Sequence, residues 1–283
     1  MNFELKIVET PRDAFQGLAD FVPTEVKIRY IDQLLKIGFH TVEVGSFVSP
    51  KAVPQMVDTA EVIQGLDLEG TDSRIMVLAA TPKAAEKAVS FSQVDDILYP
   101  FSFSKTFLQR NLKSDIEHAK ATIKEIQQIC RDGRKQLIVY LSMAFGNPYG
   151  DPWSVELVSE WVGYLVSEGI EIIPLSDISG DVSPRTIRSV FEPLRDDFPD
   201  TEFGIHLHCT QGDYYGKVNA AWECGVRRFD TVLGGIGGCP FAGDHLVSNL
   251  DTRSLVKYLI SIGYDFKLNL KEMEKALGVF LGT

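Results

Sequence analysis

The chain has 283 residues, an apolar content of 45% and a net charge of −11, which suits a globular protein with one sizeable core. Nucleic acids and anionic membranes attract basic surfaces, so this acidic balance excludes both as expected partners. The charged N-terminal segment, the four cysteines without paired spacing and the lack of an apolar run of about 20 residues predict a reduced, cytoplasmic protein.

Short apolar segments alternate with amphipathic ones along the whole chain. Nearly continuous apolar runs are typical of parallel strands that are covered on both faces. We expect strands at Leu5–Glu9, Thr41–Ser46, Arg74–Ala79, Asp95–Tyr99, Gln136–Ser142, Glu171–Leu175, Phe203–His208 and Phe229–Leu233. Capping and stop signals predict helices that begin at Thr24, Ser114, Pro152 and Ser183, and two more near Leu250–Ile260 and Leu270–Leu281.

Eight strand–helix units without an intervening linker predict one domain over residues 1–283. The expected fold is α/β, a (β/α)8 TIM barrel. An open Rossmann-like sheet is the alternative. It is disfavoured because the first turn, from Glu9 to Asp13, lacks the glycines that bind a dinucleotide.

Reactive side chains follow the predicted strands at their carboxyl ends, where a TIM barrel places its active site. They are Arg12, Asp13, Glu43, Ser46, Ser142, Asp177, His206, His208 and Cys239. Because these ends all meet at one mouth of the barrel, we expect the whole set to converge there.

The two histidines are the strongest single signal. Residues at i and i+2 of a strand face the same way, so His206 and His208 can hold one ion. Two core histidines bonded to their neighbours would give the same pattern. With Asp13, and Asn249 as a further candidate, the ligands would be a mixture of oxygen and nitrogen. That mixture favours Mg²⁺ or Mn²⁺, with zinc as an alternative.

Four of these residues have competing interpretations. Glu43 lies on a buried strand and needs a partner, for which Arg12 is the candidate. Asp13 and Asp177 could instead cap helices, as short acidic side chains often do. Cys239 alone would be read as a small buried residue, but glycines around it would let the backbone approach a ligand closely.

Together these residues resemble the 3-hydroxy-3-methylglutaryl-CoA (HMG-CoA) lyases of the DRE-TIM metallolyase superfamily. The resemblance covers nearly the whole chain. The stretches specific to the lyases are Ser46-Phe-Val-Ser-Pro-Lys51 and Gly234-Gly-Ile-Gly-Gly-Cys-Pro240. The wider superfamily shares mainly the Arg12-Asp13 pair and His206-Leu-His208. It implies a metal bound by Asp13, His206, His208 and Asn249, a catalytic set of Arg12, Asp13, Glu43, Asp177, His206 and Cys239, and substrate contacts from Arg12, Gln16, Ser46 and Ser142.

The implied reaction is the metal-dependent retro-Claisen cleavage of a 3-hydroxyacyl-CoA to acetyl-CoA and a ketone or keto acid, as in leucine degradation. Arg12 would stabilise the enolate, His206 or Asp177 would act as base, and Cys239 would be a catalytic thiol. Two alternatives stay open. One is an aldolase or Claisen-condensing enzyme on 2-oxo acids, and the other is a barrel that binds metal or a CoA ester without turnover. The oligomeric state, for which a homodimer is one option, is also open.

The chain departs from the pattern of the lyases at several positions near the expected site. They are Ala14, Phe15, Asn147, Ile178, Cys209 and Arg253. Ile178 removes a hydroxyl beside Asp177, and Arg253 replaces an expected glutamate. These departures predict a changed acyl substrate or reduced activity.

Overall fold

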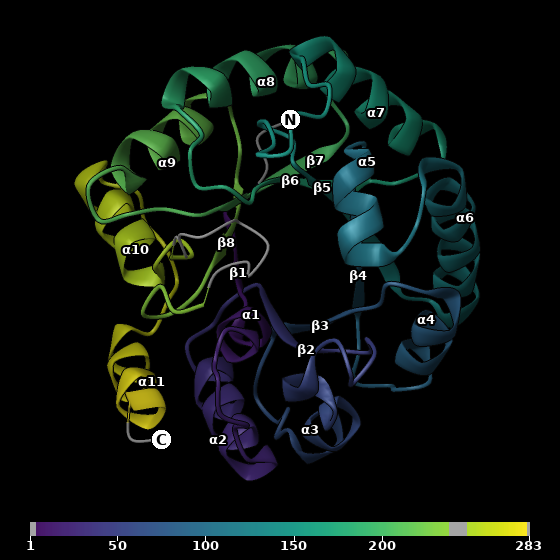
Figure 1. Cartoon of the computed structure of the whole chain (residues 1–283). Coiled ribbons are helices and arrows are strands. Elements are labelled where there is room, and N and C mark those ends of the chain that lie inside the picture. The colour runs from purple at the N-terminus through teal and green to yellow at the C-terminus, as the bar shows by residue number, and fades with distance from the viewer. Residues whose placement is uncertain (1–3, 238–247, 282–283) are drawn as a thin grey trace.

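Parallel strands close into a barrel in the computed structural model, which describes residues 4–237 and 248–281. The strands follow one another around the barrel in chain order, and β1 pairs with β8 to close it (Figure 1). They are β1 Lys6–Glu9, β2 Thr41–Ser46, β3 Arg74–Leu78, β4 Asp96–Phe101, β5 Gln136–Ser142, β6 Ile172–Asp177, β7 Glu202–Leu207 and β8 Arg228–Thr231. The predicted TIM barrel is therefore confirmed, with strand ends close to those expected.

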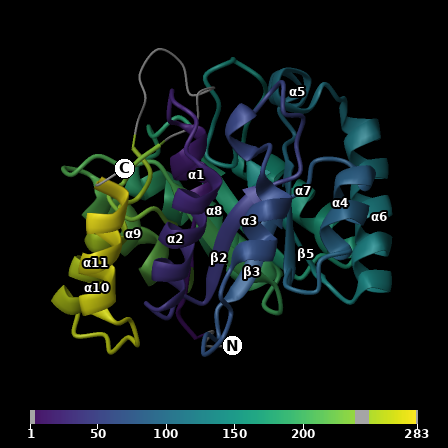
Figure 2. The same cartoon turned by 90° about the horizontal axis from the view of Figure 1, so that it is seen from below.

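Helices form a ring around this barrel (Figures 1 and 2). The longer ones are α1 Pro11–Gln16, α2 Thr24–Leu35, α3 Thr59–Gly65, α4 Pro82–Val89, α6 Ile116–Gly133, α7 Val155–Ser167, α8 Pro184–Asp197, α9 Tyr214–Glu223, α10 Thr252–Ser261 and α11 Leu270–Leu281. Short turns are η1 Pro54–Met56, α5 Lys105–Phe107 and η2 Leu108–Leu112. No helix within the described residues is long and apolar enough to cross a membrane.

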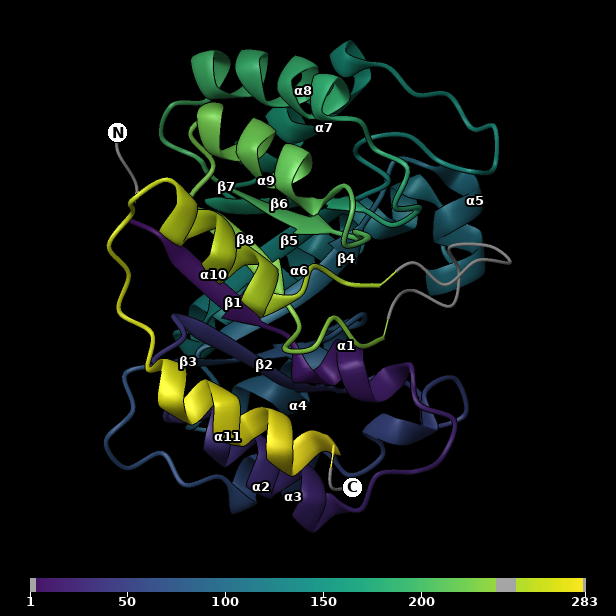
Figure 3. The ribbon, with the colours of Figure 1, turned by 90° about the vertical axis from the view of Figure 1, so that its left-hand side faces the viewer.

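The last helix completes the ring beside α2 (Figures 1 and 3). Gln33 of α2 donates a hydrogen bond of 2.7 Å to the carboxylate of Glu272 of α11. Figure 3 shows the barrel from the side, with the N-terminus at one end and α5 beyond the other. The loops at the end that carries α5 follow the carboxyl ends of the strands.

Helix starts were predicted less well than strands. Ser183 caps α8 as expected, with its hydroxyl accepting from the backbone N–H of Thr186. Helix α2 begins at Thr24 and α11 at Leu270 as predicted, whereas α6, α7 and α10 begin two or three residues later than predicted, because several residues that can cap a helix stand next to each other in the chain. Asp115 caps α6 and Ser154 caps α7, whereas the Thr24 hydroxyl donates to Asp58.

Side chains fill the barrel itself. Val8, Met76, Leu98, Ile138 and Tyr140 form a buried apolar cluster that is separate from the larger core between strands and helices. Below them, at the amino ends of the strands, lie the ion pairs Lys6–Glu202, Arg74–Asp96 and Arg228–Glu202. A barrel packed in this way is not a pore, so ligands must bind at its open mouth.

Candidate active site

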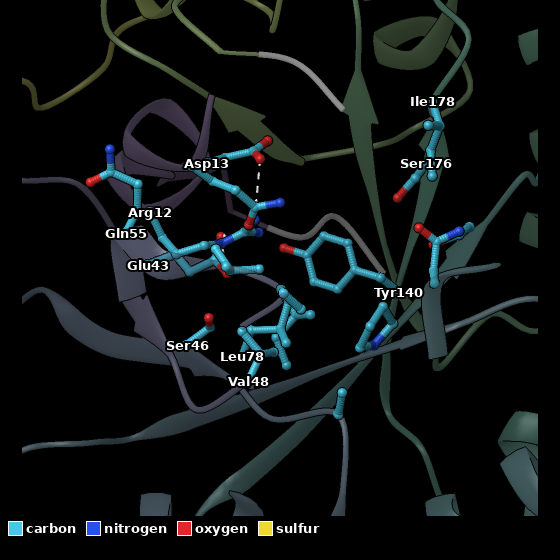
Figure 4. Close-up of a pocket in the computed structure, with 18 of the residues that line it drawn as sticks. Arg12, Asp13, Glu43, Ser46, Val48, Gln55, Leu78, Tyr140, Ser176 and Ile178 are labelled. Atoms are coloured by element: carbon cyan, nitrogen blue, oxygen red, sulfur yellow. Dashed lines mark hydrogen bonds and ion pairs between the residues drawn. The ribbon is translucent and has the colours of Figure 1, made fainter. Parts of the chain in front are cut away.

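An open cavity of about 430 Å³ lies at the carboxyl ends of the strands (Figure 4). Most of the residues selected from the sequence line it, namely Arg12, Asp13, Gln16, Glu43, Ser46, Ser142, His206 and His208. The predicted convergence on one mouth is thus seen for these residues. Asp177 and Asn249 are not among its lining residues, and Cys239 falls outside the described residues.

Arg12 is held in place by Glu43, as its burial requires. The guanidinium makes two parallel hydrogen bonds to that carboxylate, from Nε to Oε1 at 2.8 Å and from Nη2 to Oε2 at 3.0 Å. Its Nη1 also donates to Asp13 and to Gln16, each at 3.1 Å. Burial raises the pKa of Glu43, and Arg12 acts against that shift. A guanidinium anchored on both sides presents its remaining N–H to the cavity in one fixed direction.

Asp13, His206 and His208 form a compact set of ligand atoms. One atom from each residue lies within 4.8 Å of the others. Asp13 sits in the first turn of α1, whose N-cap is Thr10, so it is not the helix cap. Burial acts to raise the pKa of Asp13, but the nearby Arg12 and His206 outweigh it and lower that pKa. Asp13 therefore carries the negative charge that a cation site needs.

His208 has a free nitrogen that points at this set. Its Nδ1 donates a hydrogen bond of 2.7 Å to the carbonyl oxygen of Ile178, which leaves Nε2 as the lone-pair nitrogen. Nε2 is buried and has no hydrogen-bond partner among the residues that the structure describes. Burial and the neighbouring His206 lower the pKa of His208 to about 4, so the imidazole is neutral at pH 7. A neutral imidazole with an unused buried lone pair is what a metal ligand requires.

Asn249 stands beside His208 because the two residues form an isolated antiparallel bridge. The backbone of this segment pairs with the end of β7, where the Leu250 N–H donates to Leu207 at 2.9 Å. The Asn249 amide nitrogen donates to the carbonyl oxygen of Ile236 at 3.1 Å, while its Oδ1 is buried with no hydrogen-bond partner within residues 4–237 and 248–281. Two imidazoles, a carboxylate and an amide oxygen fit a divalent cation.

Asp177 takes part in a different network. It is 3% exposed and accepts hydrogen bonds from the N–H groups of Gly180 at 3.0 Å and Val182 at 3.4 Å. Lys217 Nζ lies 3.9 Å away and also donates to the carbonyl oxygen of His208 at 3.0 Å. These contacts shape the loop after β6, which carries the Ile178 carbonyl that orients His208.

Two residues of the site were missed in the sequence. Asp230 of β8 is 2% exposed, and its Oδ2 lies 3.2 Å from Nδ1 of His206. Tyr140 of β5 meets the His206 ring edge-on, with the ring centroids 6.5 Å apart. Burial acts to lower the pKa of His206, but Asp230 outweighs it and raises that pKa. A charged residue inside the apolar β8 segment was the available signal for Asp230.

The fold and the site define a TIM-barrel enzyme with a candidate metal centre at its mouth. The chain belongs to the HMGL-like family, whose sequence model matches residues 4–278. A mitochondrial hydroxymethylglutaryl-CoA lyase from Bos taurus is 33% identical over 279 residues, which cover 98% of this chain and 85% of that protein. A cytoplasmic 3-hydroxy-3-methylglutaryl-CoA lyase from Rattus norvegicus is 30% identical over 273 residues, or 96% of this chain and 79% of that protein.

Solved structures agree with these relatives. An HMG-CoA lyase from Acinetobacter baumannii, in complex with coenzyme A and 3-methylmalate, has a TM-score of 0.89 and 32% identity, covering 96% of this chain and 88% of that one. The resemblance seen in the motifs is thus confirmed, and the chain is a carbon–carbon lyase of the HMG-CoA lyase type.

Proposed function

We propose that this protein cleaves HMG-CoA, or a related 3-hydroxyacyl-CoA, to acetyl-CoA and a ketone or keto acid. The observation that carries the proposal is the shared cavity, where Asp13, His206 and His208 face the same space as the anchored Arg12. The A. baumannii relative that binds coenzyme A supports an acyl-CoA substrate. We also propose that residues 1–283 act as one catalytic domain.

Asp13, His206, His208 and Asn249 are the residues we assign to a divalent cation, with Mg²⁺ or Mn²⁺ preferred. The unused Nε2 of His208 and Oδ1 of Asn249 support this assignment. When bound, the ion would polarise the hydroxyl and carbonyl oxygens of the substrate and lower the pKa of the hydroxyl.

A residue near the ligand set would then act as the base that accepts the proton of the 3-hydroxyl group. Nε2 of His206 faces Asp13 at 3.8 Å, while Asp230 holds its Nδ1. Nε2 then carries the one free lone pair of the ring, so His206 can either hold the ion or accept the 3-hydroxyl proton, but not both in the same step. Asp177 is the other base named by the resemblance, and it is not among the residues that line the cavity.

Carbon–carbon cleavage would then leave its electron pair on the acetyl-CoA enolate. Arg12, positioned by Glu43, donates to the enolate oxygen where the negative charge develops. Cys239 donates the proton that converts the carbanion carbon to the methyl group of acetyl-CoA. Gln16, Ser46 and Ser142 line the same cavity, and we propose that they contact the substrate.

Acetyl-CoA release from HMG-CoA and from a panel of related esters tests the proposal. The chain is stripped with a chelator and assayed with Mg²⁺ or Mn²⁺ restored. We expect ion-dependent release, lost in His208→Ala and kept in His118→Ala, which changes an exposed histidine. Ester binding without release would favour the binding-only alternative, and cleavage of 2-oxo acid aldols alone would favour the aldolase. The cytoplasmic location and the homodimer stay predictions, to be tested by fractionation and by the mass in solution.

A further inference from the structure

The cavity has two unlike halves, and the second has no role in the steps above. One half carries the ligand set and Arg12. The other half, formed at the ends of β3 and β4 and by the loops after β2 and β4, is mostly apolar, with Asn111 as a polar residue among its lining. We infer that the preferred substrate carries, on its carbinol carbon, an alkyl chain longer than methyl that lies against this apolar half. The inference rests on the proposed lyase function and names the substrate class of the same site.

The apolar half is defined by six residues, Val48, Leu78, Ala80, Pro100, Phe107 and Leu112. Figure 4 shows Val48 and Leu78 below Tyr140, on the side of the cavity away from Asp13. Ile178 extends the apolar lining on the side of Ser176 and packs with Phe107 and Met143 in a buried cluster. An apolar surface that a ligand can reach gains free energy when a ligand covers it.

The charges of the cavity give a second reason. Arg12 is the only cation among the described lining residues, and three carboxylates, Asp13, Glu43 and Asp230, accompany it. The guanidinium already makes four hydrogen bonds to protein oxygens. The described wall therefore offers no spare positive charge for a carboxylate away from the ion.

The geometry of a tertiary alcohol turns these observations into a substrate class. Its carbinol carbon bears the hydroxyl, the thioester arm and two further arms. One further arm can reach the ion, and the other must lie against the remaining wall. A charged arm there would lose water without gaining a partner. An alkyl arm would instead gain with every methylene it buries.

A series of CoA esters tests the inference: 3-hydroxyglutaryl-CoA with methyl, ethyl or butyl at carbon 3. Affinity is measured by calorimetry with chelator present, which keeps the proposed reaction from consuming the esters. Turnover is measured with Mg²⁺. Because the CoA part is identical in the three esters, differences in affinity or in kcat/KM between them measure the contribution of the alkyl arm. We expect affinity and kcat/KM to rise about fourfold per methylene until the wall is covered.

A variant with a larger side chain in the apolar half of the cavity provides a second test. Ala80→Leu should remove most of the advantage of the butyl ester over the methyl ester. Ala121→Leu adds the same bulk on an exposed face of α6 and should leave the ratio unchanged. Thermal melts confirm that both variants fold.

The possible failures are distinguishable. If the affinity stays constant or falls from the methyl to the ethyl and butyl esters, the inference is overturned, even if every ester is cleaved. Affinity that rises with chain length while no ester is cleaved supports the apolar subsite and overturns the proposed function instead. An unchanged butyl-to-methyl ratio in Ala80→Leu would place the alkyl arm elsewhere and also count against the inference.

Discussion

Asp230 accepts a hydrogen bond from the imidazole of His206, with Oδ2 and Nδ1 3.2 Å apart. The two residues are direct neighbours in the register of β7 and β8. A carboxylate on the far nitrogen of a ligand histidine selects the tautomer and direction of the other nitrogen. Asp230 therefore acts on the metal site through His206.

Asp230→Ala should weaken Mn²⁺ binding by about 10- to 100-fold, because His206 loses its orienting partner. Asp230→Asn, which keeps an oxygen acceptor but not the charge, should lose less. Binding is measured by titration with electron paramagnetic resonance detection. Asp200→Asn changes an exposed carboxylate and serves as control. Unaltered Mn²⁺ affinity in Asp230→Ala would remove this residue from the site.

Arg12→Lys should be nearly as damaging as Arg12→Ala. A lysine cannot pair with both oxygens of Glu43 and still present a directed N–H to the enolate. We expect kcat to fall about 10²- to 10³-fold with a smaller change in KM, because the charge develops only in the transition state. Steady-state kinetics on folded protein decide the matter, and near-normal kcat in Arg12→Lys would mean that Arg12 has no part in the chemistry.

Glu9 should make stability depend on pH. It is fully buried, and burial raises its pKa to about 8, although hydrogen bonds from Thr252, Leu233 and Thr231 oppose the shift. Its ordinary value is 4.5. The folded state therefore holds a proton that the unfolded chain releases. This contribution is complete below pH 4.5 and is lost as the pH rises through about 8.

The comparison protein is Glu9→Gln, in which the carboxyl no longer titrates. Between pH 5 and pH 8.5, the free energy of unfolding of the wild type should fall relative to this variant, by at most about 4 kcal/mol. Urea denaturation at a series of pH values measures it. A constant difference between the two proteins across this window would show that Glu9 is ionised in the folded state.

Gly237→Ala should disturb the metal site through the backbone. Gly237 has a φ of +82°, and a Cβ there would lie 2.7 Å from the carbonyl oxygen of Asp13. Gly150 has a φ of +74° with nothing within 4 Å, so Gly150→Ala carries the φ strain without the clash. We expect both to lose about 1 kcal/mol from strain, but only Gly237→Ala to lose Mn²⁺ affinity. Equal affinities in the two variants would contradict this.

Cys239 should be the cysteine that alkylating reagents modify first. Cys130, Cys209 and Cys224 are buried, and burial raises the pKa of Cys130 and of Cys209 to about 12. Their thiols are therefore protonated and unreactive at pH 7. We expect a bound CoA ester to protect Cys239, and Cys239→Ser to lose most lyase activity while still binding metal. Peptide mapping by mass spectrometry measures labelling, and equal labelling of all the cysteines would count against a catalytic thiol.

Local sequence patterns were sufficient to predict the barrel and several residues of its site. Strand periodicity predicted the barrel and also placed His206 and His208 on one face, because alternation along a strand depends only on neighbouring residues. The burial of Glu43 predicted its pairing with Arg12, since a buried carboxylate needs a compensating partner. These inferences required the order of the strands but no distances between them.

Contacts between distant segments were decided only by the tertiary structure. The register of β7 against β8 brings Asp230 to His206, and the close approach of Gly237 to α1 depends on how the barrel closes. The loop after β6 donates hydrogen bonds to Asp177, which is not among the residues that line the cavity, although the sequence predicted that it would be. A one-dimensional pattern specifies the face of a residue, whereas its partner across the barrel depends on strand register and loop packing.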